Sequence, residues 1–303
     1  ADLDYEIFRV GAAEYEENGA LIPEEGFASF EKTHVLLKSP ITTPLGTGFR
    51  SLNVTLRKKY DLYANMRPAK SNAAVKTPFE HVDIVMFREN TEDLYAGVEE
   101  KIDENTAHSI KIITRKCSER IVRSAFDYAV KNKRKKVTCV HKANIMKLSD
   151  GLFRDVFYEI SREYPGIEAE DKIVDNVAMQ LVMHPETFDV IVTENLYGDI
   201  LSDLTSGLIG GLGLLPSSNM GTDFAMFEAV HGSAPDIAGK GIANPTAFLW
   251  SACMMLEHLG KQEISAKIRR AVDEVLKDGT ILTPDLGGCA GTEAYTKAII
   301  ERL

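Results

Sequence analysis

Apolar residues along this chain follow two patterns, short uninterrupted runs and longer segments with helical spacing. The runs at 83–90, 137–144 and 188–193 are rich in β-branched residues, which predicts buried strands. Amphipathic segments at 117–130 and 148–164 predict helices that pack one face on a core. Strands and helices that follow one another in this way indicate an α/β fold.

The same two patterns place the other elements. Further strands are expected at 5–10, 33–38, 62–68 and 171–176. Further helices are expected at 51–60, 246–259, 261–277 and 292–303. Residues 99–113 are polar and then β-prone, so we expect them to leave the main fold as an excursion.

The helix expected after the 188–193 strand carries both apolar and acidic residues at helical spacing. Its apolar residues should face a core: Ile200, Leu204 and Leu208. Asp199 and Asp203 lie four residues apart, which puts both carboxylates on one helix face. Two acids in a strand–turn–helix unit can bind a hard cation, which takes oxygen ligands. An alternative is that acids in a first helical turn only favour the helix dipole.

Length and composition narrow the class of protein. With 303 residues, the chain is long enough for two domains or one large α/β unit. Its net charge of -10 argues against nucleic acid as a partner, although a local arginine cluster could still bind a small anion. We expect no membrane partner, because no apolar run is long enough to span a bilayer. Four scattered cysteines and the lack of a signal peptide indicate a cytoplasmic protein, or a mitochondrial matrix protein in a eukaryote.

Three arginines come from one predicted helix and two predicted strands. Arg57 lies on the 51–60 helix, and Arg67 and Arg88 lie near strand ends. Guanidinium groups bind carboxylates through two parallel hydrogen bonds, so three of them together would suit a polycarboxylic acid. The alternative for each one is a surface arginine paired with a nearby acid.

Several polar residues are expected at the carboxyl ends of strands, where ligands gather in open α/β sheets. They are Arg67, Arg88, Lys142, Asp175 and the turn at 195–199. This agreement is the strongest argument from the residues alone for a binding site. The loop with Gly46 and Gly48 contains half of a dinucleotide fingerprint, but Ser51 stands where the third glycine belongs, so no Rossmann motif is present.

Five segments resemble the β-decarboxylating 2-hydroxyacid dehydrogenases, the family of isocitrate and 3-isopropylmalate dehydrogenases. They are residues 50–57 (RSLNVTLR), 88–97 (RENTEDLYAG), 141–145 (HKANI), 195–203 (NLYGDILSD) and 231–239 (HGSAPDIAG). The resemblance runs from about Tyr5 to the C-terminus. It implies that family's two-domain α/β fold, which is not a Rossmann fold, and a metal-dependent oxidative decarboxylation.

The resemblance also implies catalytic and metal-binding roles. Asp199 and Asp203 would hold Mg²⁺ or Mn²⁺ together with Asp175 from a second subunit. The metal would chelate the substrate hydroxyl and an adjacent carboxylate. Lys142, also from the partner chain, would be the base that acts on the hydroxyl, and Tyr95 would protonate the enolate.

The substrate implied by the resemblance is isocitrate. Arg57, Arg67 and Arg88 would clamp its carboxylates, and Ser51 and Asn53 would offer polar groups to a third carboxylate. In isopropylmalate enzymes, the corresponding surface resembles an apolar pocket. Homoisocitrate, which is one methylene longer, and 3-isopropylmalate stay as alternatives.

The cofactor implied is NAD. Asp236 can accept hydrogen bonds from a ribose diol and would repel the 2′-phosphate of NADP, and Ile237 offers a phosphate no contact. Three residues would lie by the nicotinamide: Lys38, Thr42 and Thr43. The adenosine side of the cofactor site would be formed by His231, Gly232, Ser233, Ala234, Asp236, Ile237 and Asn244.

The family's architecture implies a division into two domains and an oligomer. Residues 1–62 and 211–303 would form the large cofactor domain, whose N-terminal strand and helix are expected to be missing from this sequence. Residues 63–210 would form the small domain, with a dimer interface and a clasp-like excursion. We expect a homo-oligomer, a dimer or tetramer, with active sites shared between chains. A non-catalytic regulatory subunit is the alternative from another class, although the residues that would carry the catalysis are present.

Overall fold

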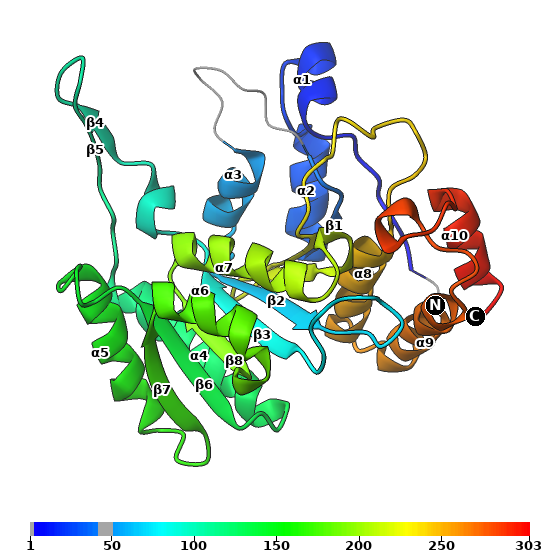
Figure 1. Ribbon diagram of the computed structural model, residues 1–303. Helices are drawn as coiled ribbons and strands as arrows, with labels where there is room; N and C mark the ends of the chain where they lie inside the picture. Colours follow the sequence, from blue (N-terminus) through cyan, green and yellow to red (C-terminus); the bar gives the residue numbers. More distant parts are fainter. Residues whose placement is uncertain (1–2, 42–50) are drawn as a thin grey trace.

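An eight-stranded sheet forms the centre of the computed structural model, which describes residues 3–41 and 51–303 (Figure 1). Its strands, in spatial order, are β1 (Val35–Lys38), β10 (Ala225–Ala229), β9 (Pro216–Met220), β2 (Ala64–Lys70), β3 (Asp83–Glu89), β8 (Val190–Thr193), β6 (Lys136–His141) and β7 (Glu168–Ile173). β3, β8, β6 and β7 run parallel to one another. β9 and β2 pair antiparallel with their neighbours, so the sheet is mixed.

Alternating side chains of the central strands build two cores on the two faces of the sheet. In β3, Val85 and Phe87 pack on α4 (Arg115–Lys131) and α5 (Ser149–Ser161). Ile84 and Met86 point to the other face, where α6 (Val174–Met183) and α7 (Asn195–Leu208) cover them. The strands are apolar on both faces because both faces are covered by helices.

The remaining helices surround the other half of the sheet. They are α1 (Ala12–Asn18), α2 (Glu24–Thr33), α3 (Leu52–Lys59), α8 (Thr246–His258), α9 (Gln262–Asp278) and α10 (Thr292–Ile300). The predicted excursion is a hairpin of β4 (Glu99–Lys101) and β5 (Ala107–Ser109) that projects away from the body (Figure 1). Within the described ranges, no helix is both long and apolar enough to cross a membrane.

One prediction about the strand ends was wrong. Arg67 was expected at the carboxyl end of a strand that Pro68 terminates, but β2 continues to Lys70 and runs antiparallel to β3. Pro68 is tolerated because β2 pairs with β9 only over residues 64–66, so this part of β2 has one free edge. Arg67 therefore reaches the site from the middle of a strand.

Other predictions also differ from the structure. Residues 5–10 form no strand, and Tyr5 and Ile7 are largely exposed. Asp175 lies in the first turn of α6, because β7 ends two residues earlier, at Ile173. Ile200 is exposed, since the buried stripe of α7 contains Leu201 and Leu208 instead.

The predicted domain boundaries coincide with a change along the sheet. β1, β9 and β10 come from the ranges 1–62 and 211–303, and β2, β3, β6, β7 and β8 come from 63–210. The two groups meet where β2 pairs with β9. The division into two domains stays a prediction, because one continuous sheet joins both groups.

Candidate active site

A polar cavity of about 230 Å³ lies where α3, β2, β3 and α7 meet the residues that follow β10. Its lining consists of Ile41, Ser51, Asn53, Val54, Arg57, Arg67, Arg88, Tyr95, Asp199, Ser217, Glu228, Ala229, Val230, His231 and Gly232. The lining thus includes all five residues that were predicted to bind substrate, together with Tyr95 and Asp199. Segments distant in the sequence converge here because the sheet brings them to one place.

The three arginines are buried in this cavity, with 7%, 5% and 1% of Arg57, Arg67 and Arg88 exposed. Arg88 donates from Nε to Asn195 Oδ1 at 2.8 Å and forms an ion pair with Asp199. Burial, together with the neighbouring arginines, lowers the pKa of Arg88 to about 9. Such crowding of positive charge favours an anion in the cavity.

Buried polar atoms of the cavity lack partners among the described residues. They are Nη2 of Arg88, Nε of Arg57 and Oδ1 of Asn53. A buried donor without a hydrogen bond costs free energy, so these guanidinium groups are ready to bind an acceptor such as a carboxylate. The unpaired donors therefore point to a polycarboxylic anion as the occupant.

Asp199 connects the arginines to Tyr95. The Tyr95 hydroxyl donates to Asp199 Oδ2 at 2.6 Å, and Arg67 Nη1 lies 3.4 Å from Asp199 Oδ1. Burial would raise the pKa of Asp199, but Arg88 and Tyr95 lower it. Burial and the bond to Asp199 raise the pKa of Tyr95, so this phenol keeps its proton.

Asp203 lies one turn further along α7, and its Oδ1 is 3.9 Å from Arg67 Nη1. Burial and the nearby Asp199 raise the pKa of Asp203, and a bound cation would act in the opposite direction. The pair supplies only carboxylate oxygens, which suit Mg²⁺ or Mn²⁺. Across the described ranges, no three His, Cys, Asp or Glu side chains gather as a metal site.

Lys142 and Asp175 form a second group of predicted site residues. Lys142 follows β6, and its Nζ donates to Asp175 Oδ1 at 2.7 Å. Neither residue is in the lining of the cavity in the described part of this chain. The structure therefore places Lys142 next to Asp175, and it places Asp199 next to the arginines. Within the described part of one chain, the Lys142–Asp175 pair lies outside the cavity that contains Asp199.

The prediction from sequence missed Glu228, a residue that lines the cavity and is only 4% exposed. Lys38 Nζ lies 2.6 Å from Glu228 Oε2, and Arg57 Nη2 lies 3.3 Å from Oε1. Burial would raise the pKa of Glu228, but Lys38 and Arg57 lower it to about 2. A single glutamate in an apolar segment gave only a weak signal. Thr42 and Thr43, predicted beside Lys38, lie outside the described residues.

The segment predicted to bind adenosine follows β10. His231 and Gly232 reach the cavity, Ser233, Ala234 and Ile237 are partly buried, and Asp236 is exposed, where it is free to meet a ligand. Asn244 is buried, donates to Asp285 Oδ2 at 2.9 Å and accepts from the Thr246 amide at 3.0 Å. Asn244 therefore also fixes the start of α8.

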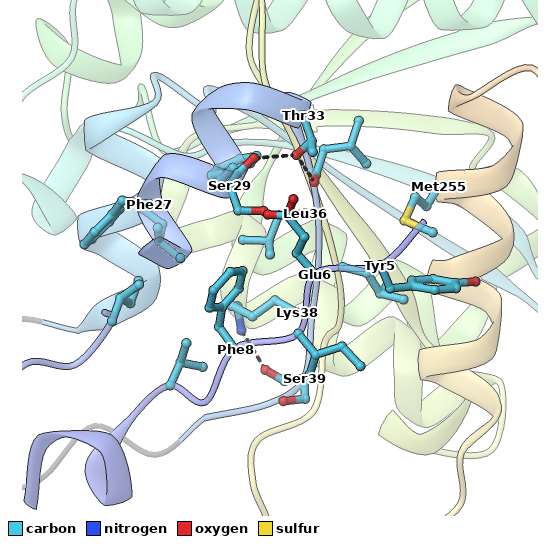
Figure 2. A pocket seen from close by; sticks show the side chains of 18 of the residues that line it. Tyr5, Glu6, Phe8, Phe27, Ser29, Thr33, Leu36, Lys38, Ser39 and Met255 are labelled. Atoms are coloured by element: carbon cyan, nitrogen blue, oxygen red, sulfur yellow. Dashed lines mark hydrogen bonds between the residues drawn. The ribbon is translucent and has the colours of Figure 1, made fainter. Parts of the chain in front are cut away.

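A larger cavity of about 520 Å³ lies beside β1, between residues 3–10, α2, α3 and α8 (Figure 2). Its lining is mostly apolar and includes Tyr5, Phe8 and Phe27. Lys38 contributes to it, but its ammonium group already bonds Glu228 and the Ser39 carbonyl. The smaller cavity is the candidate active site, because the acids, the arginines and Tyr95 converge there.

Comparisons with known proteins find one matching family and several similar sequences and structures. The family model described as isocitrate/isopropylmalate dehydrogenase matches residues 1–303. Mitochondrial NAD isocitrate dehydrogenase subunit 2 of Kluyveromyces lactis is 52% identical over 93% of this chain and 78% of its own length. NADP isocitrate dehydrogenase of Thermus thermophilus is 50% identical over 100% of this chain and 62% of its own. The crystal structure of isocitrate dehydrogenase from Methylococcus capsulatus superposes with a TM-score of 0.94 at 54% identity, covering 97% of this chain and 88% of that one.

Proposed function

The chain belongs to the isocitrate/isopropylmalate dehydrogenase family, and from this premise we propose that it oxidises and decarboxylates isocitrate to 2-oxoglutarate and CO₂ with reduction of NAD. The family membership confirms the predicted fold class and the resemblance found in the sequence. The observation that carries the proposal is the convergence of three buried arginines on one small cavity, where Arg57 and Arg88 each have a donor without a partner among the described residues. Such a cavity suits a substrate with several carboxylates.

Isocitrate is favoured over its alternatives by the polar first turn of α3. Ser51 and Asn53 line the cavity, and a serine hydroxyl and an asparagine amide nitrogen can both donate hydrogen bonds to a carboxylate. An apolar isopropyl group there would leave buried polar atoms unsatisfied, which costs free energy. The same argument leaves homoisocitrate as the closest competitor, since it also has a third carboxylate.

Each site residue then has a role in moving protons or holding the substrate. Arg57, Arg67 and Arg88 bind carboxylates and orient the carbon that is oxidised. Lys142 accepts the hydroxyl proton, and Tyr95, whose raised pKa keeps its proton in place, returns one after CO₂ leaves.

A divalent cation fits the carboxylates of α7. Asp199 and Asp203 would hold Mg²⁺ or Mn²⁺, with Asp175 of a second copy of the chain as the third acid. The cation would polarise the substrate's hydroxyl and carboxylate oxygens. Both carboxylates approach the same Arg67 nitrogen, at 3.4 Å for Asp199 and 3.9 Å for Asp203, so they lie near enough to each other to share a cation.

The choice of NAD over NADP rests on Asp236. Its exposed carboxylate can accept bonds from a ribose diol and would repel a 2′-phosphate. NAD supplies the hydride acceptor in the reaction. The relative from Thermus thermophilus is named an NADP enzyme, so the cofactor varies within the family.

We place the shared site at an interface between chains. α6 and α7 pack together, and they expose apolar side chains: Met179, Val182, Met183 and Ile200. Exposed apolar patches of this kind mark protein interfaces. A second copy docked there could bring its Lys142 and Asp175 to the Asp199 cavity.

The compartment depends on the organism. In a eukaryote, the protein would lie in the mitochondrial matrix, which the name of the Kluyveromyces lactis relative supports. In a bacterium, it would lie in the cytoplasm.

The first test is NADH formation by the purified chain with isocitrate and Mg²⁺. Turnover should be abolished by a chelator and restored by Mn²⁺, and NADP should support a lower kcat/KM than NAD. Homoisocitrate and 3-isopropylmalate, assayed in parallel, identify the preferred acid. A folded dimer that turns over none of the three acids would contradict the proposal and favour a regulatory subunit.

Gly198 is needed for the position of Arg88. A Cβ atom at Gly198 would lie 2.5 Å from Arg88 Cγ and 2.7 Å from its Cβ. Gly198→Ala should therefore displace Arg88 and raise the KM for isocitrate at least about tenfold. Gly207→Ala on the same helix is the matched control, because its added Cβ would meet nothing within 4 Å in the described part of the chain, apart from its chain neighbours and the backbone of its own helix. Equal KM values for the two variants in steady-state assays would contradict this role.

A further inference from the structure

A buried ion cluster lies at the base of the projecting hairpin. Lys111 follows β5, where the hairpin returns to the body (Figure 1). Its Nζ lies 2.6 Å from Asp150 Oδ1 and also forms an ion pair with Glu194 Oε2. The same ammonium group lies 4.4 Å from the centre of the Tyr197 ring. Lys111 therefore joins three segments that are distant in the sequence.

The cluster also contacts the main chain of the proposed base. The second oxygen of Asp150, Oδ2, accepts a hydrogen bond from the Lys142 amide at 2.7 Å and another from the Tyr197 hydroxyl at 3.1 Å. The next amide, of Ala143, donates to the Nδ1 atom of His141 at 3.0 Å. The backbone that carries Lys142 is therefore fixed by side chains rather than by sheet pairing.

On its other side, the cluster holds the start of α7. Glu194 is the residue before this helix, and Asp199 and Asp203 follow in its first turns. The Glu194 side chain is 1% exposed, and that of Asp150 is fully buried. A buried carboxylate is stable only when it is paired, so one cation keeps both acids in place.

The charges of the cluster fit a role in positioning. Burial opposes the charge of Lys111, but Glu194 and Asp150 raise its pKa, so the ammonium form is retained. Burial raises the pKa of Glu194, whose Oε1 has no partner among the described residues. Lys111 itself is fully engaged by its acids and is not in the lining of the substrate cavity, so it does not act on the substrate.

We infer that Lys111 is a positioning residue, which holds the Lys142 backbone and the start of α7 in fixed relation through Asp150 and Glu194. Its contribution to turnover rests on the proposed function, in which Lys142 and Asp199 act on the substrate. Removing Lys111 leaves both carboxylates buried with no ion-pair partner among the described residues, so the segments that they hold should separate. Small displacements of reacting groups slow the chemical step more than they weaken substrate binding.

Lys111→Met tests this inference, and Lys136→Met is the matched control. Lys136 is also a partly buried lysine, lies on the strand that leads to Lys142, and pairs with Glu170 at 3.1 Å. In Lys111→Met, kcat should fall at least about tenfold while KM for isocitrate changes less than about threefold. In the control, both constants should stay within about twofold of the wild type.

Hydrogen exchange of the Lys142 amide gives a readout that needs no substrate. In Lys111→Met, this amide should exchange at least about tenfold faster, because its acceptor Asp150 is released. If the wild type were inert toward isocitrate, faster exchange would support the positioning role and only the proposed function would be wrong. Unchanged exchange and unchanged kcat in a folded variant, or an equal loss in Lys136→Met, would overturn the inference.

A second variant keeps the test valid if Lys111→Met does not fold. The double variant Lys111→Met/Glu194→Gln removes one cation and one anion together, so of the three paired groups only the charge of Asp150 remains. It should show the same fall in kcat, of at least about tenfold, with KM nearly constant. A kcat within about twofold of the wild type would overturn the inference on its own.

Discussion

Replacing Asp199 by asparagine should lower kcat/KM for isocitrate by about 10³-fold or more. The carboxylate pairs with Arg88, accepts the Tyr95 hydroxyl bond at 2.6 Å and lies 3.4 Å from Arg67. An amide of the same size keeps the shape but removes the charge. The variant should therefore lose the ion pairs of Asp199 with Arg88 and Arg67, and also a carboxylate ligand for the proposed cation.

The effect of Asp199→Asn on the metal can be measured separately. The Mn²⁺ concentration that gives half of the maximal rate should rise at least about tenfold, because a neutral amide is a weaker ligand for a hard cation. Asp155→Asn is the matched control, since Asp155 pairs with the neighbouring Arg154 and its side chain is exposed on α5. Residual activity above about a tenth of the wild type would show that Asp199 is not at the reacting centre.

The arginine cluster was predictable because its residues follow simple rules. Arg88 ends a β-branched apolar run, and Arg57 lies on a short helix that has a buried face. Both positions can be read from local periodicity. Their convergence required only the expectation that ligands gather at one edge of an α/β sheet. Arg67 also lines the cavity, but it does not lie at a strand end as expected, because the sequence did not reveal that its strand is antiparallel and continues past it.

The strand β9, next to the cavity, was missed because its polar residues are buried. β9 contains Ser217, Ser218 and Asn219, which have the composition of a loop, yet each is at most 1% exposed. Asn219 donates to Glu228 Oε1 at 3.0 Å and accepts from Asn65 at 2.8 Å. These partners come from other strands, so no local pattern predicts that the polar groups are satisfied inside the protein.

The Lys111 cluster could not be predicted from the sequence either, because its residues are distant from one another along the chain. Lys111 lies in a polar segment, where a lysine is most often exposed. Its partners Asp150 and Glu194 follow 39 and 83 residues later. Only the fold brings the three together. Sequence patterns identify residues that bear chemistry more readily than residues that hold them in position.

Replacing Lys142 by methionine should lower kcat about 10³-fold, because the chain loses the base that accepts the hydroxyl proton. KM for isocitrate should change little, since the three arginines that bind the carboxylates are untouched. Steady-state assays across the same substrate range measure both constants. A kcat within about tenfold of the wild type would assign the base to another residue.

Lys142→Met also provides a test of the shared active site. Lys142 pairs with Asp175, and Asp199 lies with the arginines in a separate cavity of the same chain. If each site takes Lys142 from one chain and Asp199 from the other, a mixed dimer of Lys142→Met and Asp199→Asn contains one site with both changes and one intact site. Random pairing makes about half of the dimers mixed, so the mixture should recover about a quarter of the wild-type activity.

The control for this experiment follows from the 2.7 Å contact between Lys142 Nζ and Asp175 Oδ1. In the shared arrangement, one chain supplies both Lys142 and Asp175 to a given site. A mixed dimer of Lys142→Met and Asp175→Asn therefore has one site that lacks Lys142 and one site that lacks Asp175. This second mixture should stay as inactive as its components. Recovery in neither mixture would mean that each chain builds its site alone, which requires Lys142 to move toward Asp199 within one chain when the substrate binds.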